Sequence, residues 1–211
     1  MVASESCWQA INTPSNTMKK YALLAIGLLV AILTRVFDPN RMPPLLEAAR
    51  RGDTDTVRRL IDKGADVNAA PERVMSALKL AAEWGHTDTA RLLIEKGANV
   101  NAAGEYGITA LMIAARRGHT DIARLLLEHG ANINATDGGG STALMEAALK
   151  GHTDTARLLI EKGAELGVVN KYGHTALTRA NCQGHTDIVN ILKAAGAKES
   201  NPPSNTCCKA C

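Results

Sequence analysis

The sequence is poor in aromatic residues and in net charge. One Phe, three Tyr and two Trp make up 3% of the 211 residues. A core built around large rings is therefore excluded, and the 45% of the chain that is hydrophobic must pack mainly through Ala, Leu, Ile and Val. The length suits one ordinary domain with a short extension.

The small net charge of +3 lies outside the central part of the chain. Residues 1–37 contribute +2 and Lys209 contributes +1, so residues 38–200 sum to zero. A neutral domain has no long-range field that would gather phosphates, so we expect no nucleic-acid partner. The 5 cysteines are an odd number without framework spacing, and they do not predict a disulfide scaffold.

What the sequence does contain is an internal repeat of 33 residues. Two series of glycines and the tripeptides His-Thr-Asp and Thr-Ala-Leu all recur at this interval. We expect five copies, numbered here one to five, over residues 38–70, 71–103, 104–136, 137–169 and 170–200. The first glycine series is Gly52, Gly85, Gly118, Gly151 and Gly184, and the second is Gly64, Gly97, Gly130, Gly163 and Gly196.

Each copy is predicted to form two short helices, an extended segment and a turn-rich tip. In copy three, Thr109 is placed to cap the first helix, which ends at Gly118. The second helix begins near Thr120 and ends at Gly130, which suits a left-handed C′ position. Pairs of Ala allow neighbouring helices to approach closely, and pairs of Leu fill the space between layers. One copy cannot bury its own apolar face, so the copies must stack.

The terminal copies carry polar residues where the inner copies are apolar. Arg59 in copy one and Lys193 in copy five replace Leu or Ile, and Asn181 replaces the second Ala of copy five. Such replacements make sense on faces that have no neighbour. We therefore interpret the first and last copies as the caps of a complete array.

These residues resemble the ankyrin repeat. The family's pattern of Thr-Pro-Leu-His-x-Ala-Ala, Gly-His, Leu-Leu and Gly-Ala-Asp-Val-Asn-Ala is matched across residues 38–200. The resemblance implies an all-α fold, an ankyrin-type helical solenoid of five helix-turn-helix repeats with short hairpin tips. The sequence departs from the pattern at the Pro, which becomes Ala77, Ala110, Ala143 and Ala176, and at the His, which becomes Lys79, Met112, Met145 and Thr178.

Three further departures concern the segments between the helix pairs. Val74 cannot easily adopt the positive φ that the tip of copy two would need. The run Gly138-Gly139-Gly140 predicts a mobile tip in copy four. The stretch 165–169 has lost the Asn of the pattern.

Variable positions indicate where a partner binds. The structural positions recur, whereas the tips and the ends of the first helices do not, and in ankyrin proteins these positions line a concave face that grips partners. We expect a monomer that binds a protein partner there. Trp, Tyr and Arg are enriched at binding hot spots; the alternative is that these side chains cover local apolar surface. The predicted partner-binding residues are Arg73, Met75, Trp84, Tyr106, Ile108, Arg116, Arg117, Lys150, Tyr172 and His174.

The recurring histidines do not predict a metal site. Packed helical layers lie roughly 8–10 Å apart, whereas zinc needs nitrogen ligands at about 2.0–2.1 Å. Successive histidines therefore cannot share an ion, and we expect them to form hydrogen bonds between layers, with no metal and no cofactor. The equivalent residues, one per layer, are His86, His119, His152 and His185.

Catalytic constellations are weak. Cys182, His185 and Asp187 have the residue types of a nucleophile, a base and an orienting acid, but His-Thr-Asp recurs in copies that have no such cysteine. The glycine run at 138–140 lacks the Lys and Ser or Thr of a phosphate loop. We therefore predict no enzymatic activity.

The second helices carry a repeated arginine with an acidic residue four positions later. Such neighbours share one face of a helix and neutralise each other, so we expect a solvated surface and not a phosphate-binding track. The arginines are Arg58, Arg91, Arg124 and Arg157, and the acids are Asp62, Glu95, Glu128 and Glu161.

The flanks suggest a targeting segment. Residues 1–17 are polar and predict a disordered leader, with Met18 a candidate start, and residues 18–37 form a hydrophobic signal or anchor segment that begins with two lysines. The uncharged run 21–33 would span roughly 20 Å as a helix, short of a hydrocarbon core of about 30 Å. An uncleaved anchor, a cleaved signal and an extra helix packed on copy one all stay open.

From these flanks we expect membrane contact through residues 21–37 and a membrane-anchored or periplasmic, exported protein of a bacterial-like cell. The alternative is a cytoplasmic protein or a host-directed effector. The tail 201–211 predicts a disordered, Cys-containing extension, and its C-x2-C pair lacks the second pair of a structural zinc site.

Overall fold

The computed structural model describes residues 42–70 and 75–198, and within them the chain forms ten α-helices and no strand. The leader, the hydrophobic segment, the tail and Arg73 lie outside these residues, so what was predicted of them stays a prediction. No helix among the described residues is long and apolar enough to cross a membrane. The helices are α3 (Pro44–Arg51), α4 (Thr54–Asp62), α5 (Ala77–Trp84), α6 (Thr87–Glu95), α7 (Ala110–Arg117), α8 (Thr120–Glu128), α9 (Ala143–Lys150), α10 (Thr153–Glu161), α11 (Ala176–Gln183) and α12 (Thr186–Ala194).

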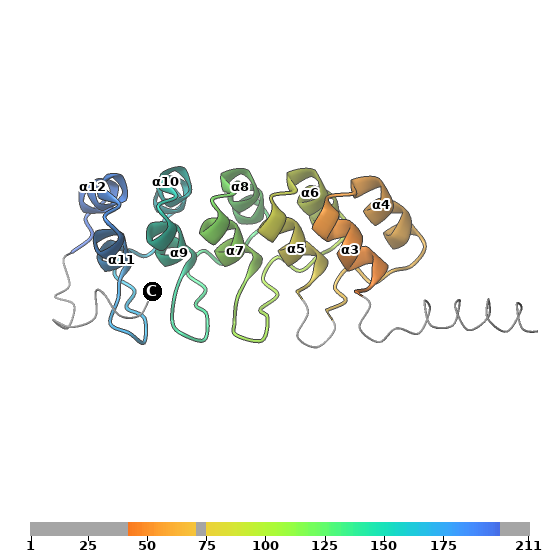
Figure 1. The fold of residues 1–211 in the computed structure, drawn as a ribbon, viewed down its shortest axis with the longest axis horizontal. Coiled ribbons are helices and arrows are strands. Elements are labelled where there is room, and N and C mark those ends of the chain that lie inside the picture. The colour runs from red at the N-terminus through yellow and green to blue at the C-terminus, as the bar shows by residue number, and fades with distance from the viewer. Residues whose placement is uncertain (1–41, 71–74, 199–211) are drawn as a thin grey trace, which may run out of the picture. The chain divides into compact units, whose positions relative to one another are not determined.

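The helices of residues 43–198 stand in two rows. The first helix of each copy packs on the first helix of the next, from α3 to α11, and the second helices form a parallel row from α4 to α12 (Figure 1). The tips project from the row of first helices on the side away from the second helices (Figure 1). The prediction of an all-α helical solenoid is confirmed.

The core is built from the small and aliphatic residues that the composition predicts. The Ala pairs of the first helices have 0% exposure in copies two to four, which lets α5, α7 and α9 approach closely. The Leu pairs of the second helices are at most 2% exposed and fill the space between the rows. Met112 and Met145, which stand in place of the family's His, are 1% exposed and belong to the same core.

Local signals set the ends of the helices. The Oγ1 atom of Thr109 accepts a hydrogen bond of 3.3 Å from the backbone N–H of Met112, which confirms the predicted cap. Gly118 ends the first helix of copy three with a φ of 75°. A Cβ atom on Gly118 would lie 2.5 Å from Nδ1 of His152, so glycine is required there by both backbone and packing.

The histidines join neighbouring copies by hydrogen bonds. The Nε2 atoms of His86, His152 and His185 lie 3.0, 3.0 and 3.2 Å from backbone carbonyl oxygens of the preceding copy. A carbonyl can only accept, so Nε2 carries the proton in each ring. For these three residues, the prediction of bonding between layers is confirmed.

Asparagines join the copies at a second place, just before each tip. Asn101 donates from Nδ2 to the carbonyl oxygen of Gly130 at 3.0 Å, and its Oδ1 accepts from the backbone N–H of Asn132 at 2.8 Å. We call such an Asn side chain a rung. Asn68 forms the same two bonds with Gly97 and Asn99.

The end copies expose their polar replacements. Arg59, Asn181 and Lys193 are all exposed, as the interpretation of copies one and five as caps expects.

The predicted arginine–acid pairs of the second helices do not form. All eight residues are described, and no pair lies within ion-pair distance. Asp62 instead accepts from Nζ of Lys96 in the next copy, at 2.8 Å. Exposed ion pairs gain little over solvated charges, so the sequence spacing alone did not determine the contacts.

Candidate protein-binding face

The predicted partner-binding residues that the structure describes lie in or beside the tips or at the C-terminal ends of the first helices. We call this set, without the buried His174, the candidate face. Its large apolar side chains are strongly exposed: Met75 by 38%, Trp84 by 54%, Tyr106 by 67% and Tyr172 by 59%. Its described members are Met75, Trp84, Tyr106, Ile108, Arg116, Arg117, Lys150 and Tyr172.

The tips of copies three, four and five are joined through their backbones. Gly138 donates to the carbonyl oxygen of Tyr106 at 2.6 Å, and Lys171 donates to the carbonyl oxygen of Gly139 at 2.9 Å. Within the glycine-rich tip, Oδ1 of Asp137 accepts from two backbone N–H groups at 2.8 Å. Glycine content predicts a mobile tip, which stays a prediction; in the structure the backbone N–H of each of the three glycines donates a hydrogen bond.

The glycine tip also lies against an aromatic ring. A Cβ atom on Gly139 would lie 3.6 Å from Cε2 of Tyr172, so the backbone of copy four lies against this ring. Tyr106 and Tyr172 are therefore presented from bonded tips.

The two arginines at the end of α7 are held by carboxylates from the neighbouring copies. Nε of Arg116 donates to Oε2 of Glu146 in copy four at 2.7 Å. Arg117 forms an ion pair with Glu83 of copy two, and this hydrogen bond raises the pKa of Arg117. Both side chains are pre-oriented, and neither is an isolated cation that waits for an acidic partner.

Glu146 is the centre of a buried charge cluster that was not predicted from the sequence. It is 6% exposed and also accepts from Nη1 of Arg179 at 3.2 Å. Arg179, with a side chain 12% exposed, also donates from Nη2 to Oγ of Ser141 at 3.1 Å. A signal was present: at the equivalent position, copies two and three have Leu80 and Ile113.

Trp84 is covered on one side by a cation. The guanidinium carbon of Arg50 lies 5.9 Å from the centre of the Trp84 ring. Arg50 also donates to Glu47 at 2.8 and 2.9 Å. The hydrogen bond from Arg50, with a further one from Arg51, lowers the pKa of Glu47 to about 2.

His174 is a correction to the predicted set. Its side chain is 7% exposed, and its Nε2 is buried with no hydrogen-bond partner. Burial, followed by the nearby charge of Arg179, lowers the pKa of His174, so the ring is held neutral. With a side chain this buried, His174 is not exposed for a partner.

Lys79 is a buried cation next to the candidate face. It is 5% exposed, and its burial lowers its pKa. Its Nζ would lie 2.9 Å from a Cβ atom on Gly104, so the end of the lysine side chain lies against the next tip. Lys79 departs from the repeat pattern, but the pattern does not predict its burial.

The described residues offer no group of three or more His, Cys, Asp or Glu placed to hold a metal ion. His185 is bonded to the carbonyl of Leu149 and so has the same structural task as the other layer histidines.

A comparison with known protein families agrees with the repeated helix pairs and with the regular spacing of the glycines and histidines. A family model described as ankyrin repeats (3 copies) matches residues 20–104, 45–137, 102–170 and 134–202, which together cover most of the chain. A search of curated proteins found no match. The chain therefore belongs to the ankyrin repeat family, whose repeats indicate a protein–protein interaction module.

Proposed function

We propose that the chain is a non-enzymatic scaffold that holds a partner protein on the candidate face. The observation that supports this is the exposure of three aromatic rings, Trp84, Tyr106 and Tyr172, each by more than half. Trp and Tyr are enriched among the residues that contribute most to binding at protein interfaces.

The frame favours binding because its groups are already ordered. Tyr106 and Tyr172 lie on tips joined by backbone hydrogen bonds, and Arg116 is held by Glu146. Association then requires little further loss of side-chain and loop freedom. Lys150 is exposed and has no ion pair among the described residues, so its ammonium group is available to pair with an acidic side chain of the partner.

The test is crosslinking in the native compartment followed by identification of the attached protein. The variant Trp84→Ala/Tyr106→Ala should lose that product, because aromatic anchors at an interface contribute roughly 2 kcal/mol or more each. The matched control is Arg91→Ala/Arg124→Ala, which removes exposed side chains from the second helices. Circular dichroism checks that both variants keep their helices. An unchanged product with the aromatic variant would show that the partner binds elsewhere.

We also propose that residues 18–37 anchor the protein in a membrane or direct its export. The support is the sequence alone: two lysines before an uncharged run of apolar residues. The alternative is a soluble cytoplasmic or host-directed adaptor that uses the same repeats. Cell fractionation of the full chain, compared with a chain from which residues 1–37 are deleted, separates the two. Full recovery of both in the soluble cytoplasm would contradict anchoring and export.

A further inference from the structure

The row of Asn rungs stops before the last copy. In copy three, Asn134 still accepts at Oδ1 from the backbone N–H of Glu165, at 2.9 Å. The next equivalent position is Gly167, which has no side chain to offer. Among the described residues, the carbonyl of Gly196 and the N–H of Lys198 therefore lack the partner that their equivalents have in copies two and three.

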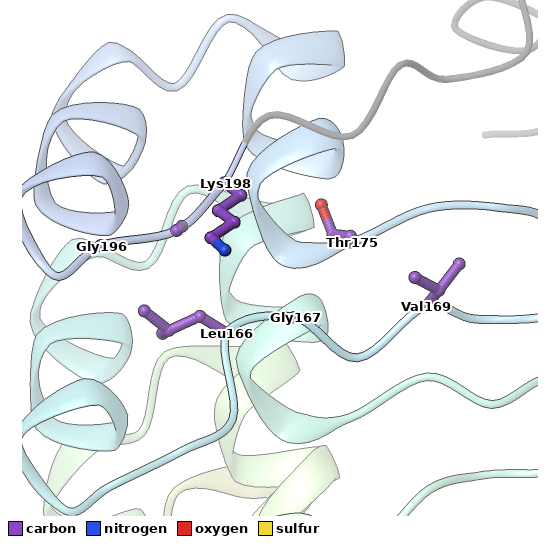
Figure 2. A pocket seen from close by; sticks show the side chains of 7 residues that line it. Leu166, Gly167, Val169, Thr175, Gly196 and Lys198 are labelled. Carbon is purple, nitrogen blue, oxygen red and sulfur yellow. The ribbon is translucent and has the colours of Figure 1, made fainter.

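A pocket of about 380 Å³ lies where the rung is missing. Gly167 and Leu166 form one wall, and Gly196 and Lys198 face them from the end of copy five (Figure 2). Val169, which is 56% exposed, gives the pocket a second apolar side chain. None of the lining residues belongs to the candidate face.

We propose that this pocket binds the side-chain carboxamide of an asparagine from a partner polypeptide. The same molecule shows the required chemistry twice: an amide N–H₂ donates to a Gly carbonyl, and the amide oxygen accepts from the backbone N–H two residues later. Gly196 and Lys198 present the same acceptor and donor at the same spacing. A carboxylate cannot donate to the Gly196 carbonyl and would leave it unpaired.

The walls add a second requirement to the occupant. Leu166 is half-buried and Val169 exposed, so an aliphatic residue beside the asparagine would cover them. The chain's own rung segments have this composition, with Val or Ile before each Asn. The partner segment is thus an aliphatic-Asn dipeptide, and this inference stands apart from the function of the candidate face.

The experiment titrates the full chain, labelled with ¹⁵N, with the probe acetyl-Val-Asn-amide. The amide signal of Lys198 should shift and saturate, because its N–H would donate to the probe, and that of Ala197 should shift because its nitrogen shares a peptide group with the Gly196 carbonyl. The isosteric probe acetyl-Val-Leu-amide should bind about tenfold more weakly, since it lacks the carboxamide. Unmoved Lys198 and Ala197 signals with the Asn probe would overturn the proposal.

Two variants locate the response. Gly167→Asn supplies the missing rung from the chain itself and should abolish the shifts. Gly167→Ala is its matched control: a Cβ atom there meets nothing within 4 Å, so the probe should still bind. An equal response of Gly167→Asn and wild type, or tighter binding of acetyl-Val-Asp-amide than of the Asn probe, would assign the signal to another site or to an acidic ligand of Lys198 and would overturn the proposal.

Discussion

The interface between copies two and three differs from the interface between copies four and five, although equivalent residues form both. In the first, Leu80 and Ile113 are buried at 4% and 3% exposure, and Asn101 forms a complete rung. In the second, Glu146 and Arg179 occupy the same positions, and the rung is absent. The same helical frame therefore accommodates either an aliphatic contact or an ion pair at these equivalent positions.

The difference shows how charge can replace apolar packing in a stacked repeat. Burying Glu146 removes it from water, and two guanidinium groups offset much of that cost, so the net stabilisation is small. The aliphatic interface gains from burial directly. Because the stability of a solenoid is close to a sum over neighbouring copies, the interface between copies four and five should be the weaker one.

The largest effect should come from removing the central carboxylate. Glu146→Ala leaves Arg179 buried without its counter-charge, which costs about 3–5 kcal/mol, measured as the loss in the free energy of unfolding in urea. The control Glu146→Leu/Arg179→Leu replaces the pair by the aliphatic solution of copies two and three and should lie within about 1 kcal/mol of wild type or above it. Equal losses for the single and double variants would show that the ion pair has no special role.

The aliphatic interface should respond to lost volume. Leu80→Ala removes a buried side chain and should cost about 2–4 kcal/mol. The milder variant Ile113→Val should cost about 0.5–1.5 kcal/mol. Both are measured by the same urea unfolding. If Leu80→Ala loses less free energy of unfolding than Ile113→Val, the site collapses around the smaller side chain.

Changes to the rungs should have smaller effects on stability. Removing a rung should destabilise the interface between copies two and three, and adding one should stabilise the interface between copies four and five. Asn101→Ala removes two hydrogen bonds at an exposed site and should cost about 1 kcal/mol. Gly167→Asn adds the equivalent bonds between copies four and five and should gain about 0.5–1 kcal/mol. Thermal unfolding of the two variants beside wild type measures both. A loss of stability in Gly167→Asn would show that the missing rung leaves no place for an asparagine.

The features that sequence could predict are those set within one copy. The cap at Thr109 and the left-handed glycine at Gly118 depend on a few neighbouring residues, so the pattern was sufficient. The ion pairs of Glu146 could not be predicted in this way. Its partners lie 30 and 33 residues away, and they meet only because the copies stack in this register.

The repeat pattern predicts which positions lie in the tips, but it does not predict how exposed each side chain is. Exposure varies among the equivalent residues of different copies. Met75 is 38% exposed, whereas Ser141 and His174 are 3% and 7% exposed. Ser141 accepts a hydrogen bond from Arg179 of the next copy, and the tips of copies four and five are bonded to each other through Gly139 and Lys171. Contacts of this kind depend on the neighbouring copy, which a single copy does not encode.

The smallest expected effect concerns Glu47, which occupies in copy one the position of Leu80 and Glu146. Arg50 and Arg51 lower its pKa to about 2, so the folded state favours the charged form. Its contribution is therefore present above the ordinary glutamate pKa and is lost as the pH falls toward 2. Glu47→Gln should flatten this part of the stability–pH curve at low salt and change little at neutral pH. Because the Glu47 side chain is 29% exposed, salt should screen the effect. Carbon NMR of the Glu47 carboxyl group measures its pKa. An ordinary glutamate pKa would show that the contacts of Glu47 with Arg50 and Arg51 contribute nothing to stability, unlike the buried cluster of Glu146.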